Sequence, residues 1–93
     1  MKVNKHHFTQ WLKGYPNIIV GESCFGYGCP IANYFKETQK IKSIHVSISG
    51  CVVDHTEFQL PLWAKMLVAR LDRYGKKEYT GKNVLKILTS LSE

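Results

Sequence analysis

The chain has 93 residues, of which 44% are hydrophobic and 12% aromatic, a share that can close one small core. The composition therefore excludes an intrinsically disordered chain and predicts a single domain over residues 1–93. Thirteen Lys and Arg residues against seven Asp and Glu residues give a net charge of +6. This charge favours a polyanionic partner, nucleic acid or an acidic protein surface, with a plain solubility charge as the alternative.

Cysteine content and hydrophobic segments indicate a cytoplasmic protein without a membrane partner. The three cysteines are an odd number, which suits a reducing compartment better than a disulfide framework. Residues 1–7 are charged and no apolar segment follows them, so no secretory signal is expected. The most apolar stretch, residues 60–71, contains Lys65 and Arg70 and is too short to span a bilayer.

The first predicted element is a helix over residues 5–13, because its apolar side chains recur at helical spacing. Asn4 is a suitable N-cap, and Gly14 followed by Pro16 ends the helix. The apolar stripe consists of Phe8, Trp11, Leu12 and Tyr15. A β-branched run at residues 17–21 then predicts a short strand.

A glycine-punctuated loop at residues 21–28 precedes a second predicted helix. Pro30 favours the first helical position. The glycines of the loop are expected to let the chain turn sharply into that helix. The inner face of the helix is expected to carry Ile31, Tyr34, Phe35 and Thr38. The three glycines also resemble a phosphate-binding loop, but neither G-x-x-x-x-G-K-[ST] nor G-x-G-x-x-G is present.

Residues 40–55 predict an antiparallel β-hairpin. Ile44, Val46 and Ile48 alternate with polar residues, which indicates one buried and one solvated face. A Ser49-Gly50 turn keeps the apolar side chains on one face. The pairs expected from this turn are Ile48 with Cys51, Val46 with Val53, Ile44 with His55 and, on the other face, His45 with Asp54.

Two further helices complete an α+β fold. Pro61 opens a helix that runs to Tyr74 and ends at Gly75, and Thr80 caps a last helix after a loop. The expected core side chains are Leu60, Trp63, Met66, Leu67, Leu71 and Tyr74 in the first of these helices and Val84, Leu85, Leu88 and Leu91 in the second. We expect a hairpin or three-stranded antiparallel sheet packed against about four helices, in the order helix, short strand, helix, two strands, helix, helix.

The cysteines and histidines suggest a zinc site that the predicted strand argues against. Cys24 and Cys29 are spaced C-x4-C, and Cys51 and His55 are spaced C-x3-H. In a strand, however, Cys51 and His55 lie roughly 13 Å apart, at ~3.3 Å per residue. We therefore expect no metal and no cofactor. The zinc set stays open only if residues 51–55 are helical.

Cys29 is also a candidate reactive thiol, because a helix N-terminus can lower the pKa of a cysteine. Cys24 would then be its resolving partner across the loop. The alternative, which we favour, is that Cys29 is a small buried hydrophobe. The Cys29-Pro30 dipeptide could also offer a thiolate to haem, on weak grounds.

The predicted His45–Asp54 pair could orient an imidazole, with Ser47 or Ser43 as a nucleophile on the same face. An open sheet face offers no pocket for such a triad, so a surface pair is the preferred interpretation. No catalytic residues are therefore assigned, and we do not expect an enzyme.

Loop aromatics and nearby cations are the candidate binding residues. Single-stranded nucleic acid is bound by rings that stack on bases and by cations that follow the phosphates. The aromatic candidates are Phe25, Tyr27 and Tyr79, and the basic candidates are Arg70, Arg73, Lys76 and Lys77. Alternatively, the rings of Phe25 and Tyr27 fold back over the core.

Three sequence stretches resemble a group of short, uncharacterised bacterial proteins, often cyanobacterial. These are Phe8-x-x-Trp11-Leu12, then Cys29-Pro30-Ile31-Ala32-x-Tyr34-Phe35, then Leu60-Pro61-x-Trp63-Ala64 leading to Leu71-Asp72. Such proteins share CPLA and LPxWA helix starts and end in a short helix. This chain differs in having Ile31 in place of Leu and in being unusually basic. The resemblance implies the architecture and a bacterial or phage origin, but no activity and no functional residue.

We therefore expect a small basic binding module that contacts nucleic acid or a nucleic-acid-associated protein. Two alternatives stay open. One is a phage-type inhibitor or adaptor that acts through protein–protein contact, and the other is a cysteine-based redox or zinc-binding module.

Overall fold

Short helices and strands alternate along the chain in a computed structural model that describes residues 4–91. Met1 to Val3, the start of the charged N-terminal stretch, lie outside the described residues. The elements are α1 (Lys5–Lys13), β1 (Ile19–Glu22), α2 (Pro30–Gln39), β2 (Ile44–Ser47), β3 (Gly50–Val53), β4 (Thr56–Phe58), α3 (Leu62–Arg73), β5 (Glu78–Thr80) and α4 (Gly81–Ser90). The predicted α+β class is confirmed.

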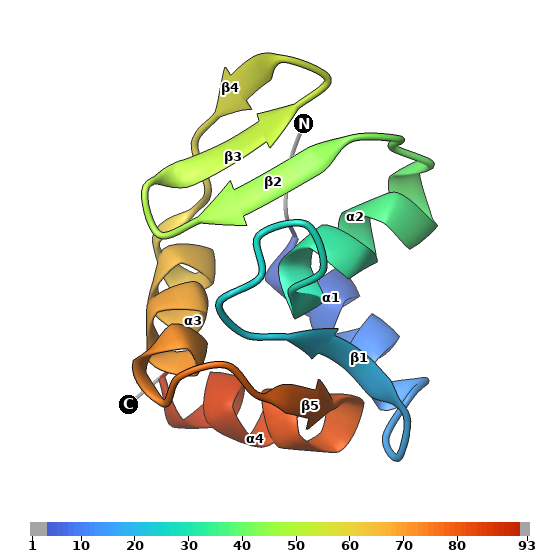
Figure 1. The fold of residues 1–93 in the computed structure, drawn as a ribbon. Helices are drawn as coiled ribbons and strands as arrows, with labels where there is room; N and C mark the ends of the chain where they lie inside the picture. Colours follow the sequence, from blue (N-terminus) through green and yellow to red (C-terminus); the bar gives the residue numbers. More distant parts are fainter. Residues whose placement is uncertain (1–3, 92–93) are drawn as a thin grey trace.

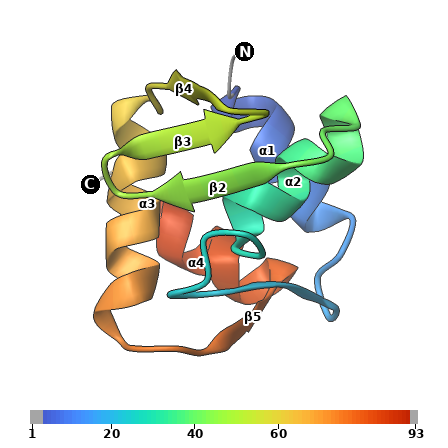
Figure 2. The ribbon, with the colours of Figure 1, turned by 45° about the horizontal axis from the view of Figure 1, so that its top comes forward.

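The strands form two small antiparallel sheets at opposite ends of the fold (Figure 1). One sheet has the order β2-β3-β4, and the other pairs β1 with β5. Helix α2 packs against both β1 and β2 and so connects the two sheets, while α4 packs against α1, α3 and β5. Figure 2 shows β2 and β3 crossing in front of the helices that cover them.

A single hydrophobic cluster connects the helices to both sheets. Its fully buried side chains include Phe8, Leu12, Ile31, Phe35, Ile44, Leu67, Leu71, Val84 and Leu88. Cores of this kind are close-packed, so they hold the surface loops that they support in fixed positions. None of the helices within residues 4–91 is long and apolar enough to cross a bilayer.

The predicted hairpin forms, but its register is wrong by two residues. Val46 pairs with Cys51 and Ile44 pairs with Val53. A shift of two residues keeps the same side chains on the same face, so the four residues of these pairs are buried as expected. Ile48 is the exception, because it lies in the turn and is exposed.

The register differs because β3 pairs on its other side with β4, a strand that the sequence did not predict. Asp54 and His55 both have positive φ, 48° and 71°, as in the two-residue turns that join antiparallel strands. This turn places Val53 opposite Thr56. Asp and His adopt positive φ more readily than most non-glycine residues, but the dipeptide lacks the glycine that usually marks such a turn in a sequence.

Most helix ends were predicted correctly. Asn4 caps α1 by accepting a hydrogen bond from the His7 amide at 3.1 Å, and Thr80 caps α4 by accepting one from Asn83. Besides Ile48, three side chains expected on the inner faces of helices are exposed, namely Thr38, Met66 and Tyr74. Strand β5, three residues long, was predicted as loop.

Candidate binding surface

The glycine loop, residues 24–28, is fastened to β2 and α2 and lies on the surface beside them. The Val46 amide donates to the Gly26 carbonyl at 2.9 Å. The Lys36 ammonium group donates to the Tyr27 carbonyl at 2.6 Å. Gly28 closes the loop, since its amide donates to the Phe25 carbonyl at 3.0 Å. The backbone of the loop is therefore held from two sides.

Ser23 fixes the base of the loop to the segment between α3 and β5. Its side chain is fully buried, and its hydroxyl donates to the Gly75 carbonyl at 2.6 Å and accepts from the Lys77 amide at 3.0 Å. The next amide, that of Cys24, donates to Oδ1 of Asp72 at 2.8 Å. Cys24 itself has a φ of 57°, a conformation that this hydrogen bond helps to hold.

Two glycines let the loop lie directly against its neighbours. A Cβ atom at Gly26 would come within 2.4 Å of Nε2 of His45 and within 2.7 Å of the Val46 carbonyl oxygen. A Cβ atom at Gly28 would come within 2.7 Å of the Phe25 ring. The chain does turn at these residues, as expected, and the close approach of backbone and ring is a second reason for both glycines.

Three aromatic side chains meet on the surface above this loop, and we call Phe25, Tyr27 and His45 the ring cluster. Phe25 is 43% exposed and Tyr27 is 57% exposed, and His45 is also exposed. The ring centroids are 6.2 Å apart for Phe25 and Tyr27 and 4.8 Å apart for Tyr27 and His45, both edge-to-face. The alternative that the two loop rings fold back over the core is therefore not what the structure has.

Two clefts border the ring cluster, and Phe25 lines both of them. The first has a volume of about 490 Å³, lies between the 24–28 loop, β2 and α3, and is lined among others by His45, Ile48, Asp72 and Arg73. The second has a volume of about 420 Å³, lies between the loop, β1 and α2, and is lined among others by Glu22, Tyr27, Lys36 and Glu78. Each cleft thus has one cationic side chain beside exposed rings.

Carboxylates in the two clefts are partly engaged by the protein itself. Asp72 accepts the Cys24 amide, and Glu22 forms an ion pair with Lys76 at 3.5 Å. Lys76 is therefore directed to Glu22, whereas Arg73 lines the first cleft. Arg70 lies one helical turn before Arg73 on α3 and is half-buried.

Tyr79 does not belong to this surface. Its ring is 3% exposed, its hydroxyl donates to the Leu71 carbonyl at 3.3 Å, and the Lys77 ammonium group lies 5.7 Å from its ring centroid. A buried ring cannot stack on a base. Tyr79 became buried because it lies in β5, which pairs with β1, and the short strand was not predicted.

The thiols do not have the properties of a reactive pair. Cys29 caps α2, with its sulfur accepting the Ala32 amide at 3.5 Å, but its side chain is buried. Burial raises the pKa of Cys29 from 9.0 to about 11, outweighing the backbone amides that lower it. The favoured interpretation of Cys29 as a buried hydrophobe is confirmed, and the lowered pKa is not found. Of the other two thiols, that of Cys24 is exposed. The thiol of Cys51 is buried, and burial raises its pKa.

The buried Cys29 thiol makes the free energy of unfolding depend on pH in the alkaline range. The thiol ionises near pH 9.0 when the chain unfolds but near pH 11 when it is folded. Its stabilisation is therefore complete below pH 9 and is lost as pH rises to 11, by about 2 to 3 kcal/mol for a shift of this size. Urea unfolding at pH 8 and pH 11 should show this loss in the native sequence and not in Cys29→Ser, which still accepts the Ala32 amide. Parallel pH profiles for the two proteins would contradict this assignment.

The zinc set and the His–Asp pair are not assembled in the structure. Within residues 4–91, no three side chains of His, Cys, Asp or Glu gather closely enough to hold a metal ion. His55 lies in the turn after β3, and Cys51 lies inside that strand with its side chain buried. His45 is opposite Val52 rather than Asp54, so the expected general-base pair is wrong. The two-residue change in register accounts for this error.

The ring cluster combines residues that sequence analysis had assigned separately. Phe25 and Tyr27 were candidates, but His45 was assigned to a different pair, and nothing in the sequence pointed to the adjacent Ile48 and Asp72.

Comparison with known proteins adds no further assignment. No protein-family model matches the chain, and no curated protein and no solved structure matches it.

Proposed function

We propose that the protein binds single-stranded nucleic acid through the ring cluster and the two clefts beside it. The observation that carries this proposal is the contact of two exposed rings, on a loop whose backbone is held from both sides, with the exposed His45 ring of β2. Bases stack on such rings irrespective of sequence. A fixed platform also loses little conformational entropy when a ligand binds.

The cations beside the rings support a nucleic-acid partner. Arg73 lines the first cleft and Lys36 the second, so a strand whose bases lie on the ring cluster has a cation on each side for its phosphates. The net charge of +6 would speed the encounter with any polyanion. The clefts also contain Asp72, Glu22 and Glu78, which favours one short bound stretch over a long backbone-tracking groove.

Replacement of Arg73 with alanine should weaken binding in a salt-dependent manner. For single strands, each neutralised phosphate contributes a slope of about −0.7 to log K against log salt concentration. Arg73→Ala should therefore lower the magnitude of the slope by about 0.7 and reduce affinity at low salt by roughly fivefold to tenfold. Fluorescence anisotropy with a labelled, mixed-sequence oligonucleotide of about twelve nucleotides measures both quantities.

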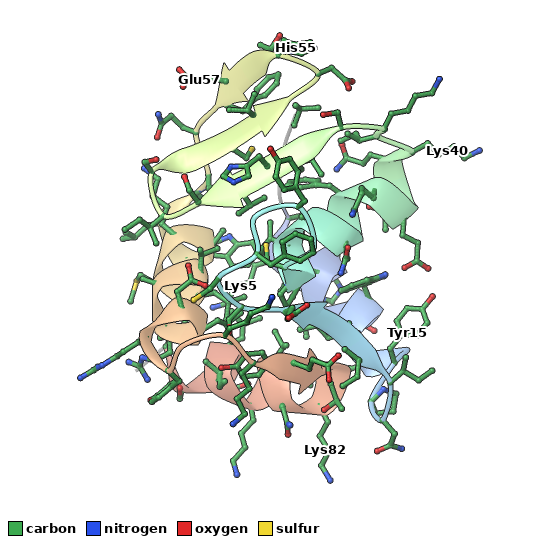
Figure 3. All side chains as sticks on the ribbon, viewed as in Figure 1. Lys5, Tyr15, Lys40, His55, Glu57 and Lys82 are labelled. Carbon is green, nitrogen blue, oxygen red and sulfur yellow. The ribbon has the colours of Figure 1, made fainter. Side chains whose placement is uncertain are left out.

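Lys82→Ala is the matched control, because it removes the same charge from α4. Lys82 is exposed and points away from the rest of the molecule at the end opposite to the β2-β3-β4 sheet (Figure 3). If both substitutions change the slope equally, binding follows net charge and not this surface. If the native protein shows no binding at about 20 mM salt, where electrostatic attraction is strongest, the proposal fails.

A protein partner is the second candidate, favoured by apolar side chains beside the first cleft. Ile48 is 57% exposed at the rim, and α3 exposes Leu62 and Met66 on its outer side. Exposed large apolar side chains contribute to protein interfaces where they gather into a patch. Such a partner would be held with little dependence on salt, so the anisotropy titration above separates the two candidates.

A further inference from the structure

A second cluster of rings joins α1 to α2 through one carboxylate. The indole Nε1 of Trp11 donates to Oε2 of Glu37 at 2.7 Å, and the hydroxyl of Tyr15 donates to Oε1 of the same carboxylate. The two rings are edge-to-face, with centroids 5.6 Å apart and planes at 65°. The Glu37 carboxylate thus lies at the polar edges of both rings, so two aromatic side chains and one negative charge meet at this corner.

This corner opens into a hollow of about 240 Å³ that is lined by Trp11, Tyr15, Glu37 and the apolar side chains of Ile18 and Ile19. Ile18 is 59% exposed and Ile19 is 50% exposed. Both large apolar side chains are therefore at least half exposed to solvent. In Figure 3, Tyr15 lies beside β1, on the side of the molecule away from α3.

The charge of the corner is negative although the protein as a whole is basic. Within residues 4–91, no Lys, Arg or His nitrogen lies within ion-pair distance of the Glu37 carboxylate. A carboxylate offers about four acceptor sites, and the two ring donors occupy two of them. A phenol is protonated at neutral pH, and the hydrogen bond to Glu37 and its charge raise the pKa of Tyr15 further, so Tyr15 adds no second negative charge.

We propose that the hollow formed by Trp11, Tyr15, Glu37, Ile18 and Ile19 binds an alkylated ammonium group. Aromatic faces attract cations through the negative charge of their π electrons, and quaternary ammonium groups are recognised in this way. The carboxylate supplies the counter-charge, and the isoleucine side chains contact the methyl groups. An anion would be repelled by Glu37, and a neutral apolar group would gain nothing from the charge. This site is separate from the proposed nucleic-acid surface and does not depend on it.

The test uses choline and its uncharged isostere 3,3-dimethylbutan-1-ol as probes of the native protein. Trp11 and Trp63 are the two tryptophans, so their indole N–H signals in ¹H–¹⁵N NMR spectra report the site and an internal reference. We expect choline to shift the Trp11 signal saturably, with a Kd in the millimolar range, about 1 to 10 mM. The isostere should bind at least about tenfold more weakly, because it lacks the charge.

Glu37→Gln removes the negative charge and keeps an acceptor for one of the two ring donors, because one carboxylate oxygen is replaced by an amide NH2 group. Choline affinity should fall about tenfold, while the circular dichroism spectrum and oligonucleotide binding remain unchanged. Conversely, a variant lacking Phe25 and Tyr27 side chains should bind choline normally. Failure of one proposal is therefore distinguishable from failure of the other.

The source of the ammonium group is distinguished by a third probe, a short peptide with one trimethyllysine, compared with its unmodified form. Tighter binding of the trimethylated peptide than of choline assigns the hollow to a modified protein side chain, and equal binding assigns it to a small molecule. The proposal is overturned if choline and the isostere shift Trp11 equally, or if no saturable shift occurs up to about 100 mM, where even a weak site would respond.

Discussion

Loss of both loop rings in the double variant Phe25→Ala, Tyr27→Ala is expected to lower affinity for single-stranded oligonucleotide by at least about tenfold. Stacking of a base on an aromatic ring contributes ~1–3 kcal/mol by alanine substitution, and two rings of the cluster are removed. The loss should persist at high salt, because stacking is not electrostatic. Anisotropy titrations at about 50 mM and 200 mM salt measure both effects.

Tyr74→Ala is the control for removal of an exposed ring, because Tyr74 is 62% exposed at the end of α3 and outside the ring cluster. It should leave affinity unchanged. The double variant is expected to fold, since both substituted side chains are exposed and neither belongs to the hydrophobic core. If it unfolds at the same urea concentration as the native protein and still binds normally, the ring cluster is not the binding surface.

Gly81→Ala is expected to cause the largest loss of stability, about 3 kcal/mol or more. Helix propensity alone predicts the opposite sign, because alanine is favoured over glycine by about 1 kcal/mol inside a helix. However, a Cβ atom at Gly81 would lie 2.4 Å from the carbonyl oxygens of both Leu12 and Tyr15. Both neighbours are backbone atoms, so α4 must move away from the end of α1.

Movement of α4 would also break hydrogen bonds that hold its first turn. The Gly81 amide donates to the Tyr15 carbonyl at 3.1 Å, and the Lys82 amide donates to the Pro16 carbonyl at 3.1 Å. Because small domains are stable by only about 5–15 kcal/mol, Gly81→Ala should lower Tm strongly in a thermal unfolding experiment.

Gly75→Ala provides a matched glycine substitution without a steric conflict. Gly75 has a φ of 79°, and a Cβ atom there would meet no atom within 4 Å. The cost should be limited to backbone strain of about 1–2 kcal/mol. If Gly81→Ala costs no more than Gly75→Ala, the contact between α1 and α4 is not as close as described.

The helices were largely predictable from sequence, because local signals determine where they begin and end. Asn4, Pro30 and Thr80 mark helix starts by chemistry that acts within one turn, and α1 has the predicted bounds. The strand faces were predictable for a similar reason, since alternation survives a shift in register by two residues. Ile44 and Val46 are buried as expected although their partners differ.

The remaining features depend on contacts between distant segments, which sequence periodicity does not encode. Strands β4 and β5 have three residues each, too few for alternation to show, and β5 buries Tyr79. The contact of His45 with Tyr27 depends on where β2 lies relative to the 24–28 loop. Glu37 was not a candidate, because its bonds to Trp11 and Tyr15 span 26 and 22 residues.

The most direct test of the proposed function is to map binding onto the native protein. ¹H–¹⁵N NMR spectra recorded during titration with a mixed-sequence single-stranded oligonucleotide report every backbone amide in turn. The largest changes are predicted at residues 24–28, 45–48 and 69–73, which border the ring cluster and the first cleft. Changes centred instead on α4, or spectra that do not change at low salt, would contradict a nucleic-acid surface at the 24–28 loop.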